Sequence, residues 1–315
     1  MIKRYAINKI LVSTLIFGLL LLFYLVPTPS FDVEIKEDDK KEIENVVYLL
    51  DDDNYVSRVI SYYDETDIEK VIRNKINILI NGDKNLDNFY SLIPKKTILK
   101  DVQVKKDSVI LNFSKEFLTV NKYIEEAMVE AIVYTLTEIN GINNIYINVD
   151  SEKFIMLPNS KKEIPYPLTR SFGINKKYDL NSLNSIDKTI VYFVKKSNDT
   201  EYYVPITKVS NLSSPKIDII IDELKSTINA QDNLNSFVSD NVVLEESKIF
   251  DDKMNLIFND YIFSDSSKKN ILEEVKYVVS QSIFDNFNVK EVIFSTKDHN
   301  NIVSVKKIKK VLENY

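Results

Sequence analysis

The sequence contains no cysteine and no tryptophan, and it has a single histidine and four glycines in 315 residues. Without cysteine the chain can form no disulfide, no thiolate metal site, no cysteine nucleophile and no lipid anchor on an N-terminal cysteine. One imidazole is too few for histidine-rich metal sites and for most acid–base triads. The lack of tryptophan also argues against a sugar-stacking module. These absences remove several classes of enzyme and binding site from consideration.

Arginine is scarce as well, and the charge balance is acidic. The chain carries 41 Lys and Arg against 47 Asp and Glu. Three of the cations lie before residue 10, so the remainder has 41 − 3 = 38 basic and 47 acidic residues, a net charge of −9. Its only arginines are Arg58, Arg73 and Arg170. Because arginine is the residue best suited to phosphate contacts, we expect no nucleic-acid partner.

Residues 10–26 form an apolar run about long enough to cross a bilayer. Lys3, Arg4 and Lys9 precede it, and acidic residues follow it. Because positive flanks remain in the cytoplasm, we expect a single-pass cell-membrane protein with the bulk of the chain extracytoplasmic. The alternative is a cleaved signal peptide, although the proline-flanked residues 26–29 match a small-x-small cleavage site poorly.

The next stretch shows the pattern of a small α+β domain. The predicted elements are a hairpin turning at residues 51–54, a helix capped by Thr66 and ending at Asn81-Gly82, a hairpin turning near Lys106, a helix with Leu136 on its buried stripe, and a final strand before Asp150. Their order is β-β-α-β-β-α-β. The amphipathic helices and half-buried strands predict about two helices on one small mixed sheet, a two-layer unit.

The same succession recurs later in the chain. VILNFSKEFL at 109–118 matches MNLIFNDYIF at 254–263, an offset of 145, and INNIYI at 142–147 matches VKEVIF at 289–294, an offset of 147. A nearly constant offset through strands and helices indicates two copies of one domain. In the second copy, Val279 lies on a predicted helix stripe like that of Leu136 in the first.

The predicted organisation therefore has six parts. They are a cytoplasmic tip with a transmembrane signal anchor (1–31), a charged stem (32–43), a first domain (44–150), a linker (151–185), a second domain (186–298) and a basic C-terminal tail (299–315). The three prolines of the linker predict that it forms no long element. Two alternatives stand for the tail, a short amphipathic helix or a solvated terminus.

Acidic residues and the lone histidine are the candidates for chemistry. They are the aspartates at 51–53, Glu116, Asp251, Asp252, Asp260 and His299. The aspartate run invites a calcium site, but it lacks the glycine and the closing glutamate of an EF-hand, and turn chemistry explains it better. The other carboxylates lie at predicted turns or strand ends without a distinctive constellation, and the histidine lies in a polar run typical of a surface. We therefore predict no catalytic, cofactor-binding or metal-binding residue, and no enzyme.

The first copy resembles a known module. LNFSKEFL followed by EAIVYTLTEINGINNIYINVD resembles the GerMN domain family of sporulation and spore germination proteins, and PLTRSFGIN in the linker is similar to the family too. The resemblance covers residues 44–173 and reaches residues 186–298 through the internal repeat. There NDYI replaces SKEF, so the second copy is divergent.

The resemblance implies an extracytoplasmic scaffold. Family members are associated with the complex that joins mother cell and forespore, and their domains are similar to ring-building motifs, which pack side by side. In this chain residues 10–26 would replace the family's lipid anchor. We expect a membrane-anchored homo-oligomer, or a member of an envelope complex with protein partners, in sporulation or spore germination. The alternative function is an extracytoplasmic ligand-binding or sensor module without catalysis.

Overall fold

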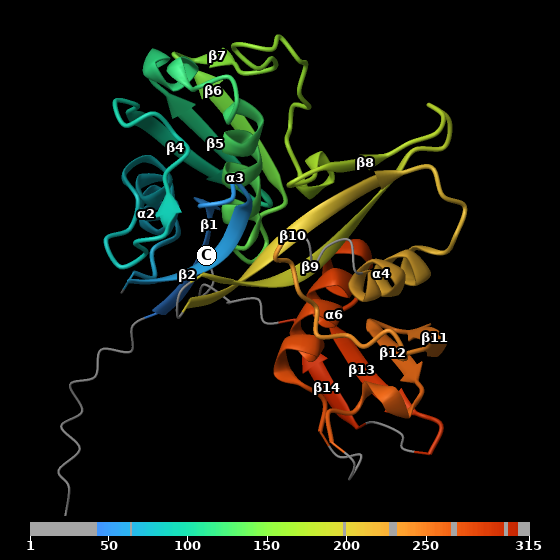
Figure 1. The fold of residues 1–315 in the computed structure, drawn as a ribbon. Coiled ribbons are helices and arrows are strands. Elements are labelled where there is room, and N and C mark those ends of the chain that lie inside the picture. Colours follow the sequence, from blue (N-terminus) through green and yellow to red (C-terminus); the bar gives the residue numbers. More distant parts are fainter. Residues whose placement is uncertain are drawn as a thin grey trace, which may run out of the picture. The chain divides into compact units, whose positions relative to one another are not determined.

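Each half of the chain contains the same succession of strands and helices (Figure 1). The first half has β1 (Ile43–Asp51), β2 (Val56–Tyr63), α2 (Ile68–Asn81), β3 (Phe89–Tyr90), β4 (Leu99–Lys105), β5 (Ser108–Phe113), α3 (Glu125–Thr137), β6 (Asn144–Val149) and β7 (Glu152–Lys153). The second half has β9 (Asp187–Ser197), β10 (Thr200–Ser210), α4 (Lys216–Lys225), β11 (Leu244–Phe250), β12 (Lys253–Phe258), α6 (Glu273–Asn286), β13 (Glu291–Thr296) and β14 (Val303–Lys306). The predicted tandem α+β order is therefore confirmed.

The computed structural model describes residues 43–63, 65–197, 200–226, 232–265, 270–298 and 302–307. The apolar run 10–26, nearly all of the predicted stem and most of the tail lie outside these ranges. Among the helices described, none is both long and apolar enough to cross a bilayer. The transmembrane anchor accordingly stays a prediction.

Each copy builds a small mixed sheet from its second hairpin and the strand after its second helix. The strand order is β4-β5-β6-β7 in the first copy and β11-β12-β13-β14 in the second. β5 and β6 run parallel, with Val109 opposite Ile145, and β12 and β13 run parallel, with Met254 opposite Val292. Parallel neighbours need a long crossover, which α3 and α6 supply. The predicted mixed sheet is present in both copies.

α2 has well-defined caps at both ends. The carboxylate of Asp67 accepts a hydrogen bond from the backbone N–H of Lys70, so Asp67 is the N-cap and the expected Thr66 is wrong. Gly82 follows the helix with φ +80° and donates its backbone N–H to the carbonyl of Ile78. An L-residue with a side chain would be strained at this φ, which explains the glycine.

The first hairpin of each copy, β1-β2 or β9-β10, is not part of the small sheet of that copy. The two hairpins pair with each other instead. β2 and β10 run antiparallel and meet where Arg58 lies opposite Tyr203. β1 then lies outside β2, with the short β3 paired to its other side, and β9 pairs with β10 along its whole length. The short strand β8 (Lys177–Asp179) of the linker adds to β10 in parallel. The result is one six-stranded sheet shared by both copies, here called the joint sheet.

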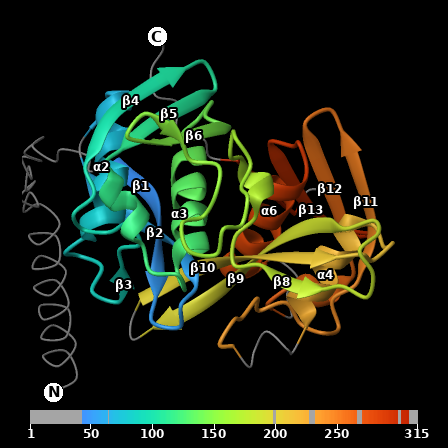
Figure 2. The ribbon, with the colours of Figure 1, turned by 90° about the horizontal axis from the view of Figure 1, so that it is seen from above.

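The joint sheet changes the layering that the sequence predicts. Eleven of the thirteen residues of α3 are buried, because this helix contacts β1 of the joint sheet and also β6 of its own small sheet (Figure 2). Each copy thus has its helices between two sheets, and the expected two-layer unit is wrong in this respect. Leu136 of α3 is fully buried and Val279 of α6 nearly so, as their stripes predict.

The linker and the tail both contribute to the sheets. Within residues 151–185, β7 pairs with β6, β8 pairs with β10, and a 3-10 helix spans Arg170–Phe172. The linker has only short elements, as its prolines predict. In the predicted tail, residues 303–306 form β14 antiparallel to β13, so this part is neither a helix nor a solvated terminus. The second domain therefore extends beyond residue 298.

Candidate functional site at the junction of the two copies

The acidic residues singled out in the sequence do not converge. Glu116 lies in the 3-10 helix Lys115–Thr119 that follows β5. Asp251 and Asp252 form the turn between β11 and β12, and Asp260 begins the 3-10 helix after β12. His299 lies outside the described residues. Nor do the acidic side chains in the described ranges form a group of three or more positioned to hold a metal ion.

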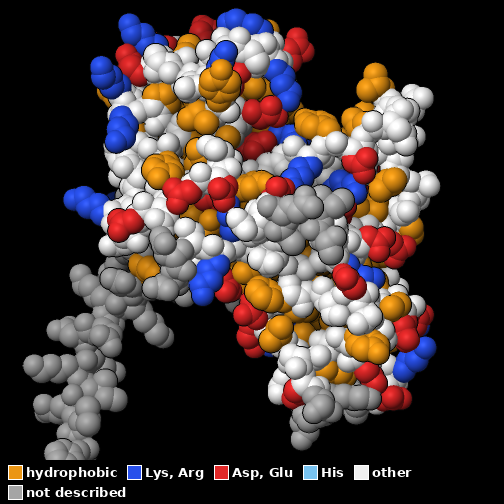
Figure 3. All heavy atoms as spheres, in the orientation of Figure 1, with side chains coloured by type: hydrophobic (Ala, Val, Ile, Leu, Met, Phe, Trp, Pro, Cys, Tyr) orange, Lys and Arg blue, Asp and Glu red, His pale blue; other side chains and the backbone are white. Residues whose placement is uncertain are grey.

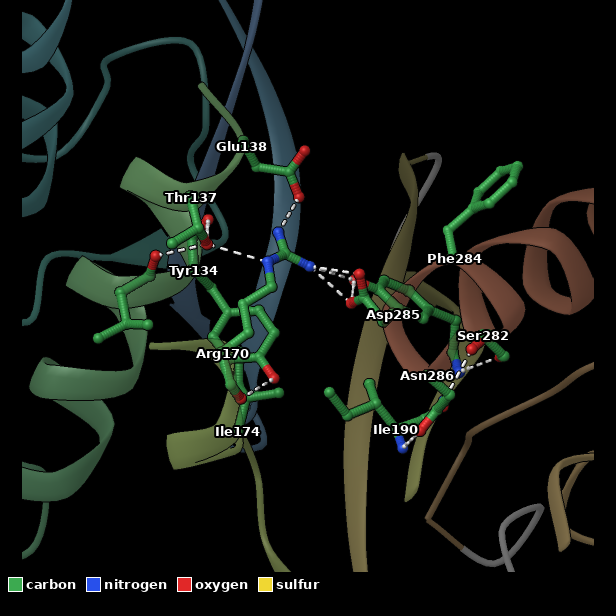
Figure 4. A network of polar contacts seen from close by, with 12 residues as sticks. Tyr134, Thr137, Glu138, Arg170, Ile174, Ile190, Ser282, Phe284, Asp285 and Asn286 are labelled. Atoms are coloured by element: carbon green, nitrogen blue, oxygen red, sulfur yellow. Dashed lines mark hydrogen bonds and ion pairs between the residues drawn. The ribbon is translucent and has the colours of Figure 1, made fainter. Parts of the chain in front are cut away.

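The most elaborate polar cluster lies instead where the two copies meet (Figure 4). Arg170 of the linker donates from Nη2 to Glu138 Oε1 at 2.6 Å and from Nη1 to the two oxygens of Asp285 at 2.7 and 2.5 Å. Glu138 caps the C-terminus of α3, and Asp285 lies near the end of α6. A single guanidinium therefore binds one carboxylate from each copy.

The linker and α3 fix the position of the guanidinium. Arg170 Nε donates to Thr137 Oγ1 at 2.9 Å, and the guanidinium carbon lies 4.7 Å from the centroid of the Tyr134 ring. A stacked cation that donates from three nitrogens to three different side chains suits arginine but not lysine. Thr169 receives the backbone N–H of Ser171 and so caps the 3-10 helix that carries Arg170. Three kinds of contact thus hold this side chain in one orientation.

Equivalent residues of the two copies meet beside Arg170. The hydroxyl oxygens of Tyr48 and Tyr192, which are 144 positions apart, lie 3.4 Å from each other. The Tyr48 hydroxyl donates to Glu138 at 2.9 Å, and that of Tyr192 donates to Asp285 at 2.7 Å. Together with the antiparallel contact of β2 and β10, these pairs relate the copies by an approximate two-fold axis.

The same symmetry governs the outer edges of β1 and β9. The backbone N–H of Tyr48 donates to Thr135 Oγ1 on α3, and that of Tyr192 donates to Ser282 Oγ on α6, both at 2.9 Å. Buried backbone donors need partners, and here helix hydroxyls supply them. Thr135 and Ser282 thereby hold each hairpin against the helix of its own copy.

Charge and burial determine the protonation of this junction. Burial opposes ionisation of the Glu138 carboxyl, but Arg170 and Arg58 outweigh it and lower its pKa to about 2. Burial also opposes the charged form of Arg170, yet Asp285 and Glu138 raise the pKa of its guanidinium above the usual range. For Tyr48, burial and the Glu138 charge raise the hydroxyl pKa. At neutral pH the junction therefore contains a charged arginine, an ionised Glu138 and a neutral hydrogen-bond donor at Tyr48.

A second ion pair between the copies lies at the end of β1. Lys195 of β9 is 2.9 Å from Asp51, and both side chains are almost fully buried. Asp51 also accepts hydrogen bonds from the hydroxyls of Ser57 and Tyr202 and from the backbone N–H groups of the turn at 53–55. Asp51 thus has the turn role predicted for it. It also forms an ion pair with Lys195, which the sequence did not predict.

The comparisons with known proteins agree with this architecture. Residues 46–154 match the family model described as "Germane: Sporulation and spore germination". Spore germination protein GerM of Bacillus subtilis (strain 168) is 28% identical over 270 residues, covering 82% of this chain and 73% of the relative. A solved structure of the tandem GerMN domains of the sporulation protein GerM from Bacillus subtilis superposes with a TM-score of 0.75 at 25% identity, over 86% of this chain and 98% of the other.

Residues 46–154 match the family, and the chain is similar to the tandem GerMN domains of GerM over most of its length. The family model covers the first GerMN domain, whereas the second is linked to it by the internal repeat and by the tandem structure, so it is the divergent copy. The resemblance inferred from LNFSKEFL and its following helix is confirmed. Because the structural match covers nearly all of the tandem domains, it extends to both copies together.

Sequence reasoning found the GerMN domains but missed their junction. The symmetry-related pairs could have been predicted from the sequence. When the two copies are aligned, Tyr48 corresponds to Tyr192 and Asp51 to Lys195, both at an offset of 144. Opposite charges at equivalent positions are what an approximate two-fold contact needs. Arg170 carried only a weak signal, as one of three arginines after residue 26.

Proposed function

We propose that this protein is a membrane-anchored extracytoplasmic scaffold that acts in sporulation or spore germination by assembling rather than by catalysis. Its similarity to the spore germination protein GerM supports the process. The apolar run 10–26 with its cationic flank supports the anchor and a location of residues 30–315 outside the cytoplasm. The scaffold would then act by self-association or by binding protein partners in an envelope complex.

The junction of the two copies is the observation that carries this proposal. The joint sheet and the Arg170 bridge make the GerMN domains one body with a fixed mutual orientation. A fixed angle between two domains decides whether repeated contacts close into a ring or continue as a filament. In contrast, an enzyme would need convergent reactive groups, and the described candidates Glu116 and Asp260 lie in different copies.

A ligand-binding or sensor module is the second candidate function. It would need a pocket with convergent polar groups. A cavity of about 390 Å³ lies between α2 and residues 95–99, but two of its polar side chains already engage neighbours: Arg73 donates to Glu69, and Asn81 donates to Asn77. The polar groups there are thus partly committed within the chain, which favours the scaffold.

Genetic complementation tests the proposal. Glu116→Gln, Asp260→Asn and His299→Ala should each restore sporulation or germination in cells that lack the native protein. Deletion of residues 44–150 or 186–298 should abolish that activity, because either deletion removes one half of the body. Membrane fractionation and immunoblotting of each variant check abundance and location. A single polar substitution that abolishes activity at normal abundance and location would contradict the scaffold and support a ligand or catalytic site.

A further inference from the structure

The two small sheets each end in a long strand with no neighbour on its outer side. β4 is the first strand of one sheet and β11 the first strand of the other, and no strand of the described ranges pairs with their outer edges. Both views place β4 and β11 on opposite sides of the described body (Figures 1 and 2). An open edge of seven residues is a ready template for another strand, and proteins usually block it with charges or bulges.

The two edges are equivalent positions with opposite charge. A register shift occurs between Leu99 and Asp101 in β4 and between Leu244 and Glu246 in β11, which fixes the alignment at an offset of 145. Residues 95–106 carry five lysines and one aspartate, a net charge of +4, whereas residues 240–251 carry four acidic residues and one lysine, a net charge of −3. In Figure 3, Lys and Arg side chains gather at the margin beside β4.

Several of these charges have no partner among the described residues. The side chains of Lys95, Lys105 and Lys106 are exposed and form no hydrogen bond or ion pair within the described part of the chain, and the same holds for those of Asp240 and Asp251. Other charged residues of the two edges form ion pairs within the chain: Lys100 pairs with Asp150, and Glu245 pairs with Lys297. The two edges are therefore oppositely charged surfaces on which some side chains, but not all, are neutralised inside the protein.

Apolar groups accompany the charges on both edges. Beside β4 lies the open cavity of about 390 Å³, whose lining includes Ile76, Ile80 and Thr97. Thr97 is 6% exposed, and its hydroxyl has no hydrogen-bond partner among the described residues. At the end of β11, Ile249 and Phe250 are 55% and 48% exposed. One edge thus offers a cavity, and the other offers large apolar side chains without cover.

We propose that the β4 edge of one molecule binds the β11 edge of a second copy of this chain, with Ile249 or Phe250 directed toward the cavity beside β4. This contact is heterologous, so each molecule of a dimer keeps one free edge, one β4 edge and one β11 edge stay open in total, and the assembly can continue. Pairing of β4 with β4 would oppose like charges, which disfavours a symmetric dimer. The inference rests on the proposed scaffold and names its contact.

Thiol cross-linking of the full-length protein in its own membranes tests the contact, since the natural chain has no cysteine. Gln103→Cys lies on β4 and Lys248→Cys on β11, and both positions are exposed. With a short bis-maleimide, cells that make both single variants should yield a cross-linked dimer, and the double variant should yield a ladder of higher multimers. Glu152→Cys on β7 and Ser304→Cys on β14 are matched controls at the opposite ends of the same sheets and should give background only.

Charge exchange separates the contact from misfolding. Lys95→Glu with Lys106→Glu should reduce the cross-linked product to the background of the controls. Adding Asp240→Lys and Asp251→Lys, the equivalent positions, should restore it, because both edges are then inverted. A Gln103→Cys variant that cross-links alone would indicate a symmetric contact and overturn the proposal. Absence of product from the mixed variants, or failure of the exchange to restore it, would overturn it as well.

The same variants distinguish this contact from the scaffold function. If no cross-link forms while deletion of either copy still abolishes activity in cells, the contact is wrong and the scaffold stands. If cross-links form, and the charge-reversed variant loses them yet supports normal sporulation or germination, the contact is real but the scaffold does not act through self-association. Product that falls with rising salt would further support an electrostatic contact, since the Debye length is about 8 Å at 0.15 M.

Discussion

Arg170→Ala removes the cation that Glu138 and Asp285 share, and we expect a large loss of stability. Breaking a buried ion pair from one side costs about 3–5 kcal/mol, because an uncompensated charge remains. The Arg170 and Glu138 side chains are each 23% exposed, so water solvates them partly and the expected loss lies near the lower end, about 3 kcal/mol. Loss of the stacking on Tyr134 adds about 0.5–1 kcal/mol.

Thermal unfolding of residues 42–315, followed by circular dichroism, measures this loss. A chain of this size shifts its Tm by about 2–4 °C per kcal/mol, so a total loss of about 3.5–4 kcal/mol should make Arg170→Ala melt roughly 7–16 °C below the natural protein at pH 7. Arg73→Ala is the matched control. It deletes the same atoms from an exposed i,i+4 pair with Glu69 at 2.8 Å and should cost less than about 0.5 kcal/mol.

The gap between the natural protein and Arg170→Ala should narrow in acid. The folded pKa of Glu138, about 2, lies below the ordinary value of about 4.3 for an unfolded glutamate. Its ionised form therefore contributes stability that is present above about pH 4.3 and lost as the pH falls toward 2. In the variant, protonation of Glu138 instead relieves its repulsion with Asp285 and so increases stability. A variant that melts within about 2 °C of the natural protein at pH 7 would refute this reasoning.

Two further predictions concern the core and the membrane. Leu136→Ala should cost roughly 2–5 kcal/mol in urea unfolding, because Leu136 is fully buried in α3. Leu118→Ala, at a position 42% exposed, is its control, and equal midpoints for the two variants would show that the α3 core assignment is wrong. Protease added to intact cells or protoplasts should digest residues 30–315, whereas protection until lysis would contradict the proposed topology.

The local elements of this fold were predictable because their signals are local. Alternating apolar residues in SVILNF and the apolar stripe around Leu136 depend only on the period of a strand or a helix. Gly82 has φ +80° and follows α2 directly, so the end of that helix could be placed from residue type alone. The same signal at Asn140-Gly141 places the end of α3 too late, because α3 ends at Thr137. Errors arose where two neighbouring residues could do the same task, as when Asp67 rather than Thr66 caps α2.

The arrangement of the hairpins was not predictable from those signals. β1 is buried on both sides, yet its sequence fits equally well a strand of its own small sheet or a strand of a sheet shared with the other copy. Pairing of β2 with β10 brings together residues 145 positions apart, and no periodicity reports such a partner. β14 was not predicted for the same reason, since four alternating residues form a strand here only because they pair with β13.

The approximate two-fold axis also restricts how the protein can assemble. An isologous contact consumes the same face on both partners, so the faces that join β2 to β10 are not available for further copies. A closed pair of domains can continue into a larger assembly only through surfaces outside the junction. The symmetry places β4 and β11 at equivalent positions there, and their opposite charges distinguish two ends that would otherwise be alike. Divergence of the second GerMN domain is then what converts a symmetric pair into a unit with direction, which a tandem of two identical domains could not provide.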